Sequence, residues 1–206
     1  TSAALVGLTP YWMSTLTTTQ MDGLTSSGMA GVTTLALNLL SSVQLASLAA
    51  TQLSGLTSLQ LASLADTQLN GLASAALTAL TTGAMNGLSG AQLSGLADTQ
   101  LNGLTSLQIN GLTPTVMANL SATRINGLAA TQLDGLTSLQ LAALANTRLD
   151  GLNSGQLLAL SATQLDGLLS WQLASLANSQ LDGLSPILLT GLADTQLNGL
   201  TSAQWT

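Results

Sequence analysis

An eight-residue repeat runs through the whole chain without an insertion or a deletion. Residues 57–64 read TSLQLASL, and the frame that opens at Thr1 is still kept at Thr206. The fifth position is Leu, Met or Ile from Leu5 to Leu197, and the eighth is Leu from Leu8 to Leu200 except at Val32. Repeats this short contact mainly their neighbours along the chain. The sequence therefore predicts one solenoid domain over residues 1–206, with a thin continuous core.

The residue types of the octad favour short helices over strands. Leu, Ala and Gln are good helix formers, whereas Val and Ile are rare. Thr57 and Gln60 have the spacing of a capping box, and all three prolines fall where the first helical residue is expected (Pro10, Pro114, Pro186). Asn-Gly and Asp-Gly pairs near the octad ends predict glycine in a left-handed helix cap. We expect an all-α solenoid of very short helices and retain a β-solenoid as the alternative.

A second period of 16 residues is superposed on the octads. Thr recurs at the third position of alternate octads, at Thr51, Thr67, Thr99, Thr115, Thr131, Thr147, Thr163 and Thr195. The intervening octads mostly carry apolar or small residues there, at Val43, Leu59, Ala75, Leu107, Leu139, Trp171 and Ile187. This alternation predicts two octads in each coil, which gives about 13 coils over 206 residues.

The composition excludes several classes of function. The chain contains no His, Cys, Glu or Lys, and its two Arg and eight Asp give a net charge of −6. Without His, Cys, Glu or Lys, general acid–base and nucleophilic catalysis have few candidates, so we expect no enzyme, no catalytic residue and no cofactor. Two Arg are too few to neutralise a phosphate backbone, which argues against nucleic acid. No apolar run approaches a membrane span.

Two polar columns are candidate binding faces. Asp134, Asp150, Asp166 and Asp182 occupy the same octad position at 16-residue intervals. Stacked carboxylates could bind calcium, although Asn takes the same position elsewhere, which favours a simple capping role. The Thr column could form a flat ice-binding face, although Thr is equally common as a cap residue.

The apolar column of Leu107, Leu139, Trp171 and Ile187 is expected to belong to the core. If it were exposed, it would form a lateral stripe suited to association. Arg124 and Arg148 replace the usual Gln, and we expect them to pair with nearby Asp.

The two ends of the sequence carry its bulkiest residues. Residues 1–34 diverge most from the octad and include Tyr11, Trp12 and Met13, while Trp205 lies next to the last residue. Bulky side chains can seal the terminal coils of a solenoid. They can also join subunits head to tail, so we expect Tyr11, Trp12, Met13 and Trp205 at assembly ends of a homopolymer.

The run Leu-Thr-x-x-Gln-Leu-x-x-Leu at residues 56–64 resembles octapeptide arrays of large secreted or surface-exposed bacterial repeat proteins, which are adhesin-like. The resemblance implies an extracellular or cell-surface location and a structural or adhesive role. Together with the repeat, it leads to the hypothesis of a structural protein that forms or extends a filament, stalk or surface layer. The alternative is a binding module, adhesive, calcium-dependent or ice-binding, that uses the Thr or Asx column.

Overall fold

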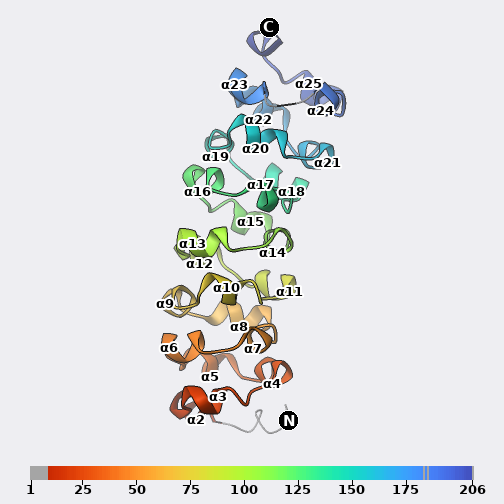
Figure 1. Cartoon of the computed structure of the whole chain (residues 1–206). Helices are drawn as coiled ribbons and strands as arrows, with labels where there is room; N and C mark the ends of the chain where they lie inside the picture. The colour runs from red at the N-terminus through yellow and green to blue at the C-terminus, as the bar shows by residue number, and fades with distance from the viewer. Residues whose placement is uncertain (1–8, 183, 185, 206) are drawn as a thin grey trace. The chain divides into compact units, whose positions relative to one another are not determined.

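The computed structural model describes residues 9–182, 184 and 186–205, without the side chains of Pro186, Ile187 and Trp205. The chain divides into two compact units, Thr1–Leu104 and Thr105–Thr206, and each is described by itself. Throughout the described residues the regular structure is helical, and no strand occurs (Figure 1). The all-α prediction is confirmed, and the β-solenoid alternative is wrong.

Each octad contributes one helix of four to six residues, and a bend separates it from the next. The helices of unit 1 are α2 (Pro10–Thr15), α3 (Thr18–Met21), α4 (Ser26–Ala30), α5 (Thr34–Asn38), α6 (Ser42–Ala46), α7 (Ala50–Leu53), α8 (Ser58–Ser63), α9 (Asp66–Asn70), α10 (Ser74–Leu77), α11 (Thr82–Met85), α12 (Gly90–Gly95) and α13 (Asp98–Asn102).

Unit 2 continues the same pattern and ends in a 3₁₀ turn. Its elements are α14 (Ser106–Asn110), α15 (Pro114–Met117), α16 (Ala122–Asn126), α17 (Ala130–Leu133), α18 (Ser138–Ala142), α19 (Asn146–Leu149), α20 (Ser154–Leu158), α21 (Ala162–Leu165), α22 (Ser170–Ser175), α23 (Asn178–Leu181), α24 (Pro186–Thr190), α25 (Asp194–Leu197) and η1 (Ser202–Trp205).

The helices begin where the capping signals predict. The Thr57 hydroxyl accepts from the Gln60 amide at 3.3 Å, while the Gln60 Oε1 accepts from the Thr57 amide at 2.8 Å. Pro10 and Pro114 occupy the first turn of α2 and α15, where a missing N–H costs no helical hydrogen bond. Local signals therefore determine the start of each helix.

The prediction of left-handed glycine caps is wrong. None of the glycines in the described part of the chain has a positive φ, and Gly71 closes α9 at φ −73°. Glycine is needed instead because another coil passes close to it. A Cβ on Gly71 would lie 2.9 Å from the Cβ of Ser42, and a Cβ on Gly55 would collide with the backbone carbonyl of Ser26.

The prediction of 16 residues per coil is also wrong. Gln60 Nε2 donates to the carbonyls of Met29 and Val32, which lie 31 and 28 residues earlier. Gln172 in unit 2 bonds the carbonyls of Leu141 and Leu144 at the same two separations. A coil therefore spans 28–31 residues, nearly four octads, and the chain has fewer coils than predicted.

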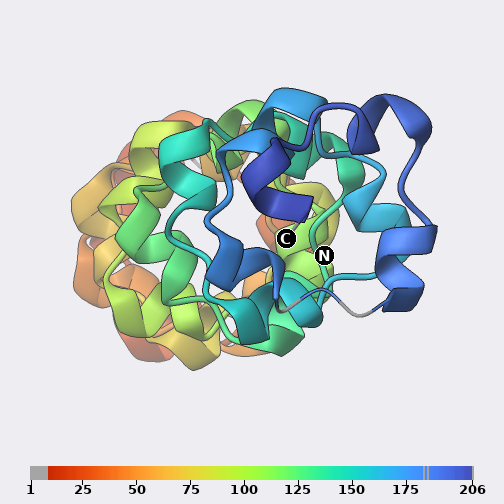
Figure 2. The same ribbon diagram turned by 90° about the horizontal axis from the view of Figure 1, so that it is seen from above.

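The core follows the two apolar octad positions, as the repeat predicts. Leu61 and Leu141 at the fifth position are both 0% exposed, and Leu64 and Leu144 at the eighth are 3% and 1% exposed. The helices lie around this interior when the ribbon is viewed after a 90° turn (Figure 2). The fifth and eighth residues thus point inward, and the third is free to face solvent.

Candidate interaction surfaces

A buried glutamine at the fourth octad position joins successive coils. Gln140 is 1% exposed, its Oε1 accepts from the Thr137 amide at 2.7 Å, and its Nε2 donates to Ile109 O at 2.8 Å and Leu112 O at 2.6 Å. One side chain therefore satisfies both a helix N-terminus and two carbonyls of the preceding coil.

The same arrangement recurs through both units. Buried Gln at this position are Gln52, Gln60, Gln68, Gln92, Gln100, Gln108, Gln132, Gln140, Gln156, Gln164, Gln172, Gln180 and Gln196. We call this set the glutamine network.

Sequence reasoning assigned these glutamines to capping and missed their role between coils. A signal was present in the octads where Ala occupies the N-cap. Ala has no side-chain acceptor, so Gln52 after Ala49 cannot complete a reciprocal capping box. Gln52 nevertheless accepts from the Ala49 amide at 2.8 Å and donates to Leu24 O at 2.8 Å. A Gln that recurs regardless of the cap residue indicates a second partner.

The longer coil divides each 16-residue column between two sides of its unit. Residues 16 apart are separated by about half of a 28–31-residue coil. Asp134 and Asp150 therefore lie on different sides, as do Thr131 and Thr147. In the described residues, no group of three or more acidic side chains is placed to hold a metal ion. The prediction of single stacked Asp and Thr columns is wrong.

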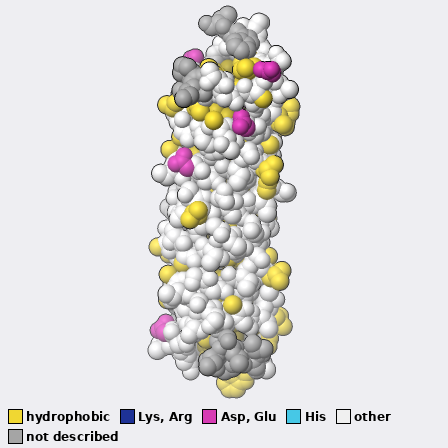
Figure 3. All heavy atoms as spheres, turned by 90° about the vertical axis from the view of Figure 1, so that its right-hand side faces the viewer, with side chains coloured by type: hydrophobic (Ala, Val, Ile, Leu, Met, Phe, Trp, Pro, Cys, Tyr) yellow, Lys and Arg dark blue, Asp and Glu magenta, His cyan; other side chains and the backbone are white. Residues whose placement is uncertain are grey.

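The Asp and Thr side chains of these columns are nevertheless exposed. The four candidate calcium residues, Asp134, Asp150, Asp166 and Asp182, are all at the surface, as are all eight Thr of the column. On the face shown in Figure 3, acidic side chains stand singly among uncharged polar side chains and backbone.

The expectation that the apolar third-position residues are core is wrong. Leu107 and Leu139 are each 70% exposed and Trp171 is 50% exposed, whereas the side chain of Ile187 lies outside the described residues. The glutamine network connects the three helices that carry them, since Gln140 in α18 bonds α14 and its C-terminal bend, and Gln172 in α22 bonds α18 in the same way. Leu107, Leu139 and Trp171 therefore form an exposed row over successive coils of unit 2.

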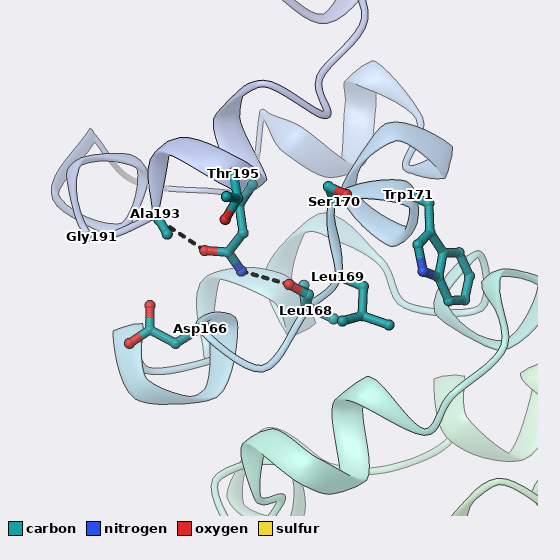
Figure 4. Close-up of a pocket in the computed structure, with 9 residues that line it drawn as sticks. Asp166, Leu168, Leu169, Ser170, Trp171, Gly191, Ala193 and Thr195 are labelled. Carbon is teal, nitrogen blue, oxygen red and sulfur yellow. Dashed lines mark hydrogen bonds between the residues drawn. The ribbon is translucent and has the colours of Figure 1, made fainter.

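A surface depression of about 620 Å³ lies beside the end of this row. Its walls include Leu169, Trp171, Asp166 and Thr195, and Gln196 bridges Ala193 N and Leu168 O across it (Figure 4). The depression combines one aromatic ring, one carboxylate and one hydroxyl without a catalytic base.

A second depression of about 340 Å³ lies among the last octads of unit 2 and is mostly apolar. Leu181, Leu184, Leu189, Leu197 and Leu200 line it together with Asp182 and Gln204. Leu181, Leu189 and Leu197 occupy the fifth octad position, which other coils bury almost completely. They are only half-buried here.

The predicted assembly residues near the N-terminus divide into two groups. Tyr11 and Trp12 are 73% and 61% exposed, whereas Met13 is 1% exposed and belongs to the core. Trp205 ends the turn η1, and its side chain lies outside the described residues.

Arg148 takes the place of a network glutamine. Its Nε donates to Leu120 O at 2.6 Å, which is the bond that Gln makes to the carbonyl 28 residues earlier. This backbone contact explains why Arg is accepted at the position, and the expected Asp partner is not needed for it. The equivalent Nε of Arg124 is buried.

No protein-family model and no curated protein matches this chain. Among the described residues, no helix has the length and apolar character needed to cross a membrane. The geometry itself therefore carries the functional argument.

Proposed function

We propose that this is a non-enzymatic structural repeat protein, which forms or extends an extracellular filament, stalk or surface layer by stacking of coils. The observation that supports this proposal is the glutamine network. Each network side chain is withdrawn from solvent and bonds one coil to the next, as Gln140 does with three backbone groups. Such a repeated buried contact favours a stiff array over a mobile binding loop.

The apolar depression at the end of unit 2 supports extension by the same contact. It presents half-buried leucines at octad positions that are buried wherever another coil follows. A further octad coil, supplied by a second copy, would cover Leu197 and Leu200 as the coils of unit 2 cover one another.

Electron microscopy over a concentration series tests this proposal. We expect filaments of the wild-type chain that grow with concentration, and we expect Leu200→Asp to prevent them. Leu158→Asp is the matched control, because Leu158 is 54% exposed on α20 and lies outside the depression. Single-chain particles at every concentration, or equal loss in both variants, would contradict coil stacking.

An adhesive binding module is the second candidate, favoured by the exposed row of Leu107, Leu139 and Trp171 and by the depression beside Trp171. This candidate predicts that the monomer adheres to a panel of immobilised glycans and matrix proteins. The double variant Leu139→Asp/Trp171→Asp should abolish that adhesion, and adhesion that survives it would refute this use of the row.

A further inference from the structure

Five large apolar side chains are exposed close together in the first octads of unit 1. Tyr11 and Trp12 lie on α2, Leu35 lies on α5, Leu39 follows it, and Val43 lies on α6. They are 73%, 61%, 61%, 48% and 70% exposed, respectively. We name these five residues the N-terminal apolar patch.

The three elements of the patch are packed together. Helices α2 and α5 are in contact, and Gln44 at the start of α6 donates to Ser14 O at 3.1 Å and Leu16 O at 2.8 Å, at the end of α2. Met13 is buried on the inner side of α2, which holds Tyr11 and Trp12 outward. Side chains of this size present on the order of 500 Å² together, which is at the upper end of what monomeric proteins expose.

The patch lies in the least charged part of the chain. Residues 1–65 contain a single charged side chain, Asp22, whereas the other seven Asp lie between Asp66 and Asp194. Two copies of a chain with net charge −6 repel each other wherever their Asp-bearing octads meet. They can approach through residues 1–65 with little such repulsion.

We propose that the N-terminal apolar patch is a side-to-side contact between two copies of this chain. Other partners fit the patch less well. A lipid surface is usually bound by apolar side chains flanked by Lys or Arg, and residues 1–65 contain neither. A basic protein would be attracted to the later, Asp-bearing octads. This inference goes beyond coil stacking, because the exposed third-position residues Tyr11, Leu35 and Val43 take no part in the glutamine network.

Sedimentation of a matched pair of double variants tests the contact. Tyr11→Asp/Val43→Asp and Leu107→Asp/Leu139→Asp add the same two charges at the same octad position in successive coils. The four residues are also similarly exposed, at 70–73%. We expect wild-type self-association to weaken more than about a hundredfold in the first variant and to persist in the second. A wild-type chain that stays monomeric, including one that floats with phosphatidylcholine vesicles, or equal weakening in both variants, would overturn the proposal.

Cross-linking identifies the surface directly, because the chain has no native Cys. Val43→Cys should give a covalent dimer under mild oxidation, whereas Leu139→Cys at the equivalent position of unit 2 should not. Dimers formed equally by both, or by Leu139→Cys alone, would overturn it. Filaments that remain in Tyr11→Asp/Val43→Asp but no longer pair sideways would leave coil stacking intact, so the two proposals can fail separately.

Discussion

Two glycines at the same octad position should respond to alanine with opposite signs. Gly87 follows α11, and a Cβ there would collide with the backbone carbonyl of Ser58 in the adjacent α8. Gly95 ends α12, and a Cβ there would meet nothing closer than the Asp66 Cγ at 3.7 Å, an ordinary contact. The pair therefore separates close coil contact from backbone conformation as the reason for glycine.

The magnitudes follow from these distances. In Gly87→Ala the coils must move apart or the backbone must bend, and overpacking of this kind costs about 1–3 kcal/mol. In Gly95→Ala the residue has a negative φ and open space, so the gain in helix propensity should stabilise the protein by roughly 0.5–1 kcal/mol. We expect a difference between the two variants of about 2–4 kcal/mol in unfolding free energy.

Thermal unfolding followed by circular dichroism measures the sign, and hydrogen exchange locates the effect. One kcal/mol corresponds to about 2–4 °C for a cooperative protein of this length. Because solenoids respond locally, the amides of α8 and α11 should exchange faster in Gly87→Ala and remain unchanged in Gly95→Ala. If the two variants lose equal stability, glycine is conserving a backbone conformation and our account of coil contact is wrong.

Three further results are expected. Gln140→Leu should lower the unfolding free energy by about 2–4 kcal/mol because it leaves the carbonyls of the preceding coil without a donor, whereas Gln20→Leu, at an exposed capping glutamine, should cost less than about 1 kcal/mol; equal urea midpoints would refute the role between coils. Leu141→Ala should cost about 2–5 kcal/mol and Leu139→Ala almost nothing, since the two residues are 0% and 70% exposed; similar losses would contradict the assignment of inside and outside. Calcium should leave the melting temperature unchanged, because no group of three acidic side chains is assembled among the described residues; a rise that EDTA reverses would disprove this.

The helix starts could be predicted because their signals are local. Thr57 and Gln60 are three residues apart, and their two hydrogen bonds need only one turn of helix. Pro114 acts through its own ring and the missing N–H. The buried positions were equally accessible, since Leu61 and Leu64 repeat in every octad.

The length of a coil could not be predicted in the same way. It depends on the angle at every bend, and these small angles accumulate over nearly four octads before two segments meet. The 16-residue alternation of Thr and apolar residues reports which octads share a type of surface, and it was misread as the length of a turn. The contact of Gly55 with Ser26, 29 residues apart, involves no sequence signal beyond the glycine itself.

The mismatch between octads and coils also limits what the surface can do. Equivalent octad positions recur every 32 residues, but the coils meet at separations of 28–31 residues. Thr67 and Thr99 are therefore displaced sideways from one coil to the next, and every column of equivalent residues winds around its unit. A flat ordered face cannot persist over several coils under this geometry, which weighs against ice binding and against a calcium ladder. Contacts that need only one or two coils, such as the N-terminal apolar patch and the stacking face of a coil, are compatible with it.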